Sequence, residues 1–226
     1  MKTVSILVAA GAASAGTLLF ARVANALGPV DVEVAARVGG GTSPVSSGSN
    51  SSNSSNLDIN PLGFGVGGRA GVSFFHVYAG LSAMYYFGGG KDVPTVPGMP
   101  PAHESGTSVL YGAEVGYDIG LLGITVRPQV GVGKYTLNVD GSAQVCIGAG
   151  GCAMYSGSST WDNVYVEPGI MAKASFGKWL VGADANLFWL PGSDKVDISL
   201  CPSPVCHYTL TSQLAFTAHG QVGVQF

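Results

Sequence analysis

The sequence predicts an all-β fold, an eight-stranded antiparallel up-and-down β-barrel that spans a membrane, on three observations. The 226 residues are 46% apolar but only 10% charged, with a mean hydropathy of +0.35, whereas soluble domains carry about 25% charged residues. Apolar and polar residues alternate with a period of two through most of the chain. The few charges fall on one side of that alternation. These features exclude an ordinary soluble domain and a disordered chain, and a net charge of −3 leaves no basic surface for nucleic acid.

Residues 1–26 are predicted to be a signal peptide that is removed. Lys2 precedes an uncharged stretch from 4 to 21, and Ala24-Asn25-Ala26 provides the small-x-small pattern that a signal peptidase recognises. The alternative is an uncleaved transmembrane anchor, but Gly, Ser and Thr dilute the stretch and the processing site follows at once. We therefore expect the barrel domain to cover residues 27–226.

The remaining chain shows the alternation expected of β-strands, whose neighbouring side chains point to opposite faces. In Val30–Val38, for example, every even position is apolar, while Asp31, Glu33 and Arg37 occupy odd positions. No stretch after Ala26 approaches the roughly 18 apolar residues that a transmembrane helix needs. The predicted strands are 30–38, 62–74, 77–87, 109–117, 124–132, 164–176, 179–189 and 214–226.

The charged residues indicate which face meets lipid, because a charge on the lipid face near mid-bilayer costs about 2–4 kcal/mol for Arg or Lys. They predict a polar interior in which six acids and four bases form a salt-bridge network, since buried charges must be paired. This structural interpretation is favoured over acid/base catalysis by the same carboxylates. Lys134 and Asp162 have the opposite parity and are expected near water, at the loop ends of their strands. The predicted interior set is Asp31, Glu33, Arg37, Arg69, Glu114, Asp118, Arg127, Glu167, Lys173 and Asp184.

The connections alternate in predicted length, as short periplasmic turns and long outer loops do in bacterial outer-membrane barrels. The long ones are 39–60, 88–106, 140–160 and 191–208, and the short ones are 75–76, 119–123 and 177–178. This pattern predicts four long extracellular loops and two periplasmic ends. Aromatic residues gather at both strand ends, as in interfacial girdles. The loop-end set is Phe64, Tyr85, Phe87, Tyr111, Trp161 and Trp189, and the turn-end set is Phe74, Tyr117, Phe176, Trp179 and Phe226.

Two prolines and four cysteines need separate explanations. Pro128 and Pro168 fall inside predicted strands, and because proline cannot donate to a strand ladder, we expect a bulge or a local break in pairing at each. The cysteines lie in the predicted third and fourth loops, where close spacing favours the disulfides Cys146–Cys152 and Cys201–Cys206, with other connectivities open. A four-thiolate zinc site is the less favoured alternative, because the spacing is not typical of zinc ligands.

Together the signal peptide, the eight alternating segments, the long and short connections and Phe226 resemble the small outer-membrane β-barrel family of the OmpA/OmpX type. The resemblance implies an outer-membrane location in a Gram-negative bacterium. In that family a C-terminal Phe, here Phe226, is part of the signal read by the barrel-assembly machinery. Outer-membrane lipids and that machinery are thus the implied partners of a monomeric barrel, with no nucleic acid, cofactor or metal.

For function, we expect a non-enzymatic barrel with a structural role in the envelope or an adhesion-like surface role carried by its loops. The alternative is a narrow channel for small or apolar solutes, which glycines on the interior parity favour by removing side-chain bulk (Gly63, Gly65, Gly67, Gly131 and Gly133). A lipid-modifying enzyme is least favoured. His219 faces inward and is followed two residues later by Gln221 rather than Ser, so no catalytic constellation is visible.

Overall fold

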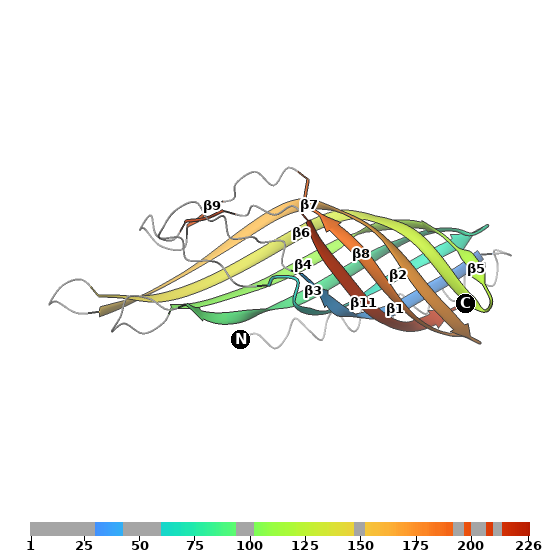
Figure 1. Ribbon diagram of the computed structural model, residues 1–226, viewed down its shortest axis with the longest axis horizontal. Helices are drawn as coiled ribbons and strands as arrows, with labels where there is room; N and C mark the ends of the chain where they lie inside the picture. Colours follow the sequence, from blue (N-terminus) through green and yellow to red (C-terminus); the bar gives the residue numbers. More distant parts are fainter. Residues whose placement is uncertain are drawn as a thin grey trace.

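The structure is a computed structural model that describes residues 30–42, 60–93, 102–146, 152–191, 197–199, 207–209 and 214–226. These residues form a closed antiparallel β-barrel (Figure 1). The predicted signal peptide, residues 1–26, lies outside the described ranges. Among the described residues, no helix is long and apolar enough to cross a membrane.

Eight strands form the barrel wall, and each pairs with its neighbour in sequence until β11 closes the barrel against β1. The predicted fold class is therefore confirmed. The short β5 continues the line of β4 along β6, and β9 and β10 form a separate two-stranded sheet. The strands are β1 (Val30–Gly41), β2 (Phe64–Phe74), β3 (Val77–Val93), β4 (Ala102–Tyr117), β5 (Ile119–Leu121), β6 (Ile124–Cys146), β7 (Cys152–Phe176), β8 (Trp179–Trp189), β9 (Asp197–Ser199), β10 (His207–Thr209) and β11 (Leu214–Gln225).

The pairing register sets the tilt of the strands. Following paired residues once around the barrel from Asp31 leads back to β1 at Gly41, which is 41 − 31 = 10 residues further along. At about 3.3 Å per residue and about 4.8 Å between strands, this stagger corresponds to a tilt of about 41° for eight strands. The intermediate positions are Ser73, Tyr78, Gly116, Gln129, Gly169, Asn186 and Thr217.

The wall is apolar on its outer surface. Leu81, Val115, Ile170 and Val181 all point outward and are more than half exposed, whereas the charged residues between them point inward. On β8 the exposed Trp179 and Trp189 stand ten residues apart, which is about 25 Å along the barrel axis at the tilt above and matches the apolar band of an outer-membrane barrel. Val32 is an exception, because it has the outward parity and is buried.

Both prolines interrupt pairing without changing the register. Opposite Pro128, pairing between β4 and β6 stops at Gly116–Gln129 and resumes between β5 and β6 at Ile119–Val126, three residues further on each strand. Opposite Pro168, pairing between β7 and β8 is missing between Val166–Trp189 and Gly169–Asn186. Neither strand gains an extra residue, so the expected local break is confirmed at both sites and a bulge is not needed.

Two predicted loops are mostly strand. β3 and β4 continue into the predicted second loop, and β6 and β7 continue through most of the predicted third loop (Figure 1). The predicted bounds of loops 88–106 and 140–160 are therefore wrong. We call the extension the outer sheet: residues 88–93 of β3, 102–108 of β4, 134–146 of β6 and 152–163 of β7.

At the opposite end, two-residue turns join the strands. The turn residues Phe75, His76, Leu122 and Gly177 have positive φ angles, Leu122 at 48°, as hairpin turns that match the strand twist require. Leu122 is fully exposed. The predicted link 119–123 is shorter than expected, because β5 occupies most of it and only Leu122 and Gly123 form the turn.

Candidate functional site

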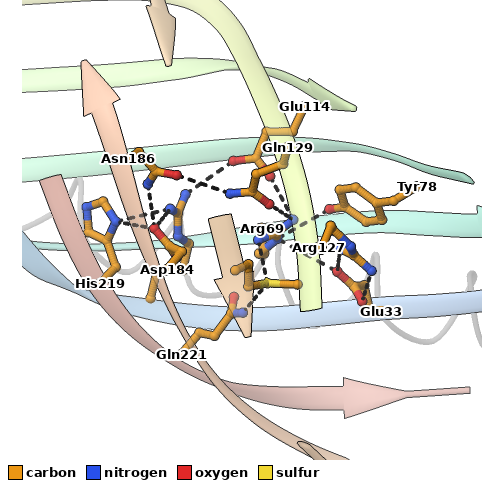
Figure 2. A network of polar contacts seen from close by, with 12 residues as sticks. Glu33, Arg69, Tyr78, Glu114, Arg127, Gln129, Asp184, Asn186, His219 and Gln221 are labelled. Atoms are coloured by element: carbon orange, nitrogen blue, oxygen red, sulfur yellow. Dashed lines mark hydrogen bonds and ion pairs between the residues drawn. The ribbon is translucent and has the colours of Figure 1, made fainter. Parts of the chain in front are cut away.

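The half of the interior nearest the short turns is filled by a charged network centred on Arg127 (Figure 2). Its guanidinium donates to both carboxylate oxygens of Glu33, at 2.5 and 3.0 Å, and to both of Asp118, at 2.6 and 2.9 Å. Lys173 donates to Glu33 at 2.6 Å. Strands β1, β6 and β7, together with the link between β4 and β5 that carries Asp118, thus place these groups in one layer, where Arg127 is 0% exposed. A buried network of this kind is stable only when each charge has partners.

Tyr78 packs between this layer and the next one. The guanidinium of Arg127 lies 3.6 Å from the centroid of the Tyr78 ring, and that of Arg69 lies 4.9 Å from it. Arg69 also donates to the Tyr78 hydroxyl at 3.3 Å and pairs with Glu114 at 3.0 Å. Figure 2 shows Tyr78 beside both arginines. Such cation–π contacts are stronger where water is excluded, so the ring links two charged layers.

The next layer joins Arg37, Asp184 and His219. Arg37 pairs with Asp184 at 2.8 Å and with Glu114 at 3.3 Å, and His219 Nδ1 lies 2.8 Å from Asp184. Tyr86 Oη lies 2.7 Å from His219 Nε2. His219 Nδ1 also lies 3.1 Å from the guanidinium of Arg37, so the imidazole contacts both members of the Arg37–Asp184 ion pair. The chain of groups resembles a catalytic relay, but all four side chains are buried in the barrel interior.

The half of the interior nearest the outer sheet is apolar. Along β8 and at Leu190 directly after it, the inward side chains change from Asp184 and Asn186 to Phe188 and Leu190, and all four are buried. Edge and stacked aromatic contacts join Phe188 to Tyr135 and Tyr165. This cluster, which we call the apolar cap, closes the outer end of the polar interior. Its members are Leu62, Met84, Tyr86, Leu110, Tyr135, Leu137, Val139, Tyr165, Phe188, Leu190 and Ala215, with Trp161 packed against them.

Most of the predicted interior residues meet in this network, but two of them differ from the expectation. Asp31 has the inward parity, yet it is exposed at the turn end and makes no ion pair among the described residues, because it lies beyond the Arg127 layer. Glu167 is buried and accepts a hydrogen bond from Thr217 at 2.7 Å, again without an ion pair in the described part of the chain. Sequence reasoning left out several neutral interior residues, whose inward parity is the signal that identifies them: Ser73, Tyr78, Tyr86, Met171 and Thr217.

At several interior glycines of the described residues, a neighbouring side chain occupies the space that the glycine leaves. A Cβ on Gly65 would stand 2.5 Å from the Tyr86 ring, and one on Gly67 would stand 2.5 Å from the Met84 sulfur. Gly71 likewise faces the ring of Tyr78. Large neighbouring side chains therefore occupy the space that these glycines release. Gly131 alone among the predicted set has room, with its nearest atoms at 3.7 Å.

The outer sheet presents a second candidate surface. Its outward side chains on β6 are Lys134, Thr136, Asn138 and Asp140, so the apolar outer wall becomes polar at Lys134. Lys134 pairs with Asp162 of β7 at 2.8 Å, and both are partly exposed. The expected outward placement of this pair is correct, but the two residues lie within long strands rather than at their ends. Trp161, predicted for the outer girdle, instead packs inward against Tyr135.

Of the two predicted disulfides, only Cys146–Cys152 involves residues that the structure describes. Cys146 and Cys152 are directly opposite each other in the β6–β7 register, which is compatible with the predicted bond, and the disulfide stays a prediction. Cys201 and Cys206 lie outside the described residues.

Comparisons with known proteins show the fold. No protein-family model and no curated protein matches the chain. The major outer membrane protein of Thermus thermophilus is similar in structure, with 12% identity, a TM-score of 0.60, and coverage of 87% of this chain and 99% of that chain. Ail, the attachment invasion locus protein of Yersinia pestis, has 11% identity and a TM-score of 0.47, and the match covers 87% of this chain and 98% of that chain. The N-terminal β-barrel domain of Pseudomonas aeruginosa OprF has 15% identity and a TM-score of 0.38, and the match covers 87% of this chain and 97% of that chain. The first likeness shows that the chain has the fold of an outer-membrane β-barrel.

Proposed function

We propose that the protein is an integral, non-enzymatic barrel of the outer membrane of a Gram-negative bacterium. Its short turns, the start of β1 and the end of β11 then lie in the periplasm. The observation that carries this proposal is the separation of surfaces, with an apolar outer band about 25 Å high and charges buried inside. A soluble barrel would have the opposite arrangement. The name of the Thermus neighbour, a major outer membrane protein, supports the location.

The filled interior favours a structural or surface role over transport. The Arg127 layer, the Arg37 layer and the apolar cap succeed one another along the axis, and their side chains are buried. An apolar constriction resists water and ions even when it is narrowly open. We therefore propose that the barrel does not conduct, and that its function lies in envelope integrity or in contacts made by the outer sheet and loops. Outer-membrane lipids, and the assembly machinery acting through Phe226, are the proposed partners of a monomer.

Site-directed spin labelling of the barrel in lipid bilayers tests the membrane assignment. Labels at Ala83 and Val181 should be accessible to oxygen in the acyl region, whereas a label at Thr136 or Thr160 of the outer sheet should be accessible to a water-soluble nickel reagent. Heat-modifiable gel mobility checks that each labelled protein is a closed barrel. Water contact at Ala83 and Val181 in a closed barrel would contradict the proposal.

Conductance separates the proposed role from the narrow-channel alternative. In planar bilayers the protein should give no discrete, reproducible openings. Such openings in a protein whose apolar cap is intact would favour a channel for small solutes. Lipid A mass spectrometry after expression should likewise show no new modification, since the Asp184–His219–Tyr86 chain is buried in the barrel interior.

A further inference from the structure

The outward face of the outer sheet is polar, and in its lower part the side chains are already bonded to one another. Lys134 pairs with Asp162 at 2.8 Å, and Thr136 donates a hydrogen bond to the same carboxylate at 2.6 Å. Further up the sheet, Thr160 donates to Asn138 at 2.9 Å. These groups offer little to a ligand, because binding would only exchange one hydrogen bond for another.

The upper part of the same face differs, because most of its side chains lack partners. Two rows of direct cross-strand neighbours, which stand about 5 Å apart, cross β4, β6 and β7 there. The first row is His103, Ser142 and Ser156, and the second is Ser105, Asp140 and Ser158. Only His103 has a side-chain partner, Asp92 of β3 at 2.8 Å. In the described part of the chain, no side-chain hydrogen bond or ion pair involves Asp140 or the four serines.

The six residues of the two rows line a groove of about 370 Å³, to which Gly141 and Gly157 contribute only backbone. This volume lies at the lower end of the range of small-molecule sites, about 300–1,000 Å³. It suits a group the size of one polar side chain. It is larger than a bare metal ion needs, and the described residues contain no group of three side chains that could hold a metal.

The charge of this face favours a cationic ligand. The charged residues at its outward positions are Asp92, Asp140 and Asp162 against Lys134, and Lys134 is already paired with Asp162. Asp140 is therefore a carboxylate without a counterion among serine hydroxyls, which repels an anion and attracts a cation. A neutral sugar would leave this charge uncompensated, and it would meet no Phe, Tyr or Trp ring among the lining residues.

Among organic cations, a guanidinium matches the groove best. It is planar, carries five N–H donors and binds one carboxylate through two parallel hydrogen bonds. Its other N–H groups can donate to Ser105 and Ser158, which flank Asp140 in the same row. A lysine ammonium has three donors around a single point, so it would use fewer of these hydroxyls.

The groove lies clear of the lipid. Asp140 is six residues beyond Lys134 on β6, which is about 15 Å along the axis at the strand tilt above. Lys134 itself lies where the outer wall has already become polar. The groove also faces away from the barrel axis, so a chain dissolved in the surrounding water can reach it without entering the barrel or the membrane.

We propose that this groove binds an arginine side chain presented by an exposed, basic segment of a protein outside the cell. The inference rests on the proposed function, because it needs the barrel in a membrane with the outer sheet on the outside. It adds the chemistry of the partner, a guanidinium group, and the place where it binds, the Asp140 groove on the outward face of β4, β6 and β7.

The test uses the whole barrel in nanodiscs of phosphatidylcholine, a lipid without net charge, and a ligand-detected NMR titration that reports weak binding. The probe is a short Gly/Ser peptide with one central arginine. Matched peptides carry citrulline, which has nearly the same shape without the charge, or lysine. The arginine peptide should bind above the level of empty nanodiscs, the lysine peptide several-fold more weakly, and the citrulline peptide about tenfold more weakly or less.

Asp140→Asn should weaken binding of the arginine peptide about tenfold, because it removes the charge and keeps the shape. Asp162→Asn is the matched control on the same face, one strand across and four residues down the sheet, or about 14 Å away. It should leave binding nearly unchanged, since at physiological salt the Debye length is about 8 Å. Ser105→Ala/Ser158→Ala, which changes no charge, should weaken binding several-fold.

Heat-modifiable mobility confirms that each variant is a closed barrel. The inference is overturned if the inserted wild-type barrel binds the arginine peptide no better than empty nanodiscs do, or if the citrulline or lysine peptide binds equally well. It is also overturned if closed Asp140→Asn keeps full binding, or if Asp162→Asn loses as much, which would show a general attraction of the face and no site. Failure of the wild-type barrel to insert would instead contradict the proposed function.

Discussion

Arg127 on β6 and Glu33 on β1, 94 positions apart in the chain, form a two-pronged ion pair across the interior, with distances of 2.5 and 3.0 Å. Asp118 occupies the other side of the same guanidinium. One side chain therefore joins β1, β6 and the link between β4 and β5 from inside, at a level where the wall itself is interrupted by Pro128.

Arg127→Met should destabilise the barrel by about 3–5 kcal/mol, because it leaves the buried Glu33 with only Lys173 and the more distant Arg69, and the partly buried Asp118 with Lys173 at 3.8 Å. The midpoint of urea unfolding in lipid vesicles, followed by heat-modifiable mobility, measures the change. Lys134→Met is the control, since it breaks a solvent-exposed pair with Asp162, whose loss should lower the unfolding midpoint far less. Equal effects of the two variants would show that burial of the Arg127 network contributes little.

Gly80→Ala should destabilise the barrel, because the new methyl group would collide with the hydroxyl of Tyr78 and with the backbone of β2. Overpacking of this kind costs about 1–3 kcal/mol. Gly131→Ala is a matched interior change with its nearest atoms at 3.7 Å, and it should be neutral or slightly stabilising. If both variants had the same unfolding midpoint, the interior would not be packed around Tyr78 as described.

Leu122→Asn should stabilise the barrel by about 1 kcal/mol. Leu122 has a φ of 48° in the turn between β5 and β6, a left-handed conformation that costs most L-residues about 1–2 kcal/mol and that Asn tolerates. Its side chain is fully exposed, so little packing is lost. Leu121→Asn, at the neighbouring outward position, should instead destabilise the barrel. A lower unfolding midpoint for Leu122→Asn would point to a contact of the Leu side chain with lipid.

Cys146 and Cys152 should be joined in protein secreted to the periplasm. Alkylation without reductant, followed by intact mass and peptide mapping, should leave both thiols unmodified. Cys146→Ser should expose one reactive thiol at Cys152 and leave the barrel closed, because the bond lies at the tip of the outer sheet and outside the barrel wall. Labelling of both cysteines in the unreduced protein would contradict the predicted pairing.

The sequence was sufficient to predict the eight strands because alternation is a local property, but it misplaced the ends of four of them. Above Lys134 the alternation continues with its meaning reversed. Tyr135, Leu137 and Val139 still alternate with polar residues, yet the apolar set now faces inward and the polar set faces water. A Ser- and Gly-rich stretch with this pattern is easily read as a loop, and the same reversal explains why Trp161 is not in the girdle.

The interior was predictable as a set of residues and not as a set of contacts. Inward parity alone places Glu33, Arg127 and Asp118 in the barrel, but which of them meet depends on the ten-residue stagger of the strands. That quantity is a property of the closed ring and cannot be read from one strand. Tyr78 was missed for a related reason, because its ring fills the space over Gly71 and Gly80 and interacts with charges on other strands.

The pairing of β1 with β11 also limits how the barrel can assemble. Every other wall strand bonds to its neighbour in sequence, whereas here the two ends of the described chain meet, with Val32 and Phe226 exchanging hydrogen bonds of 3.0 and 2.9 Å. Closing so long a loop carries the largest entropic cost of any pairing in the molecule. Until this seam forms, the sheet exposes two unsatisfied edges, each of which is costly in hydrocarbon. Formation of the β1–β11 seam is therefore the pairing that removes both of these edges at once.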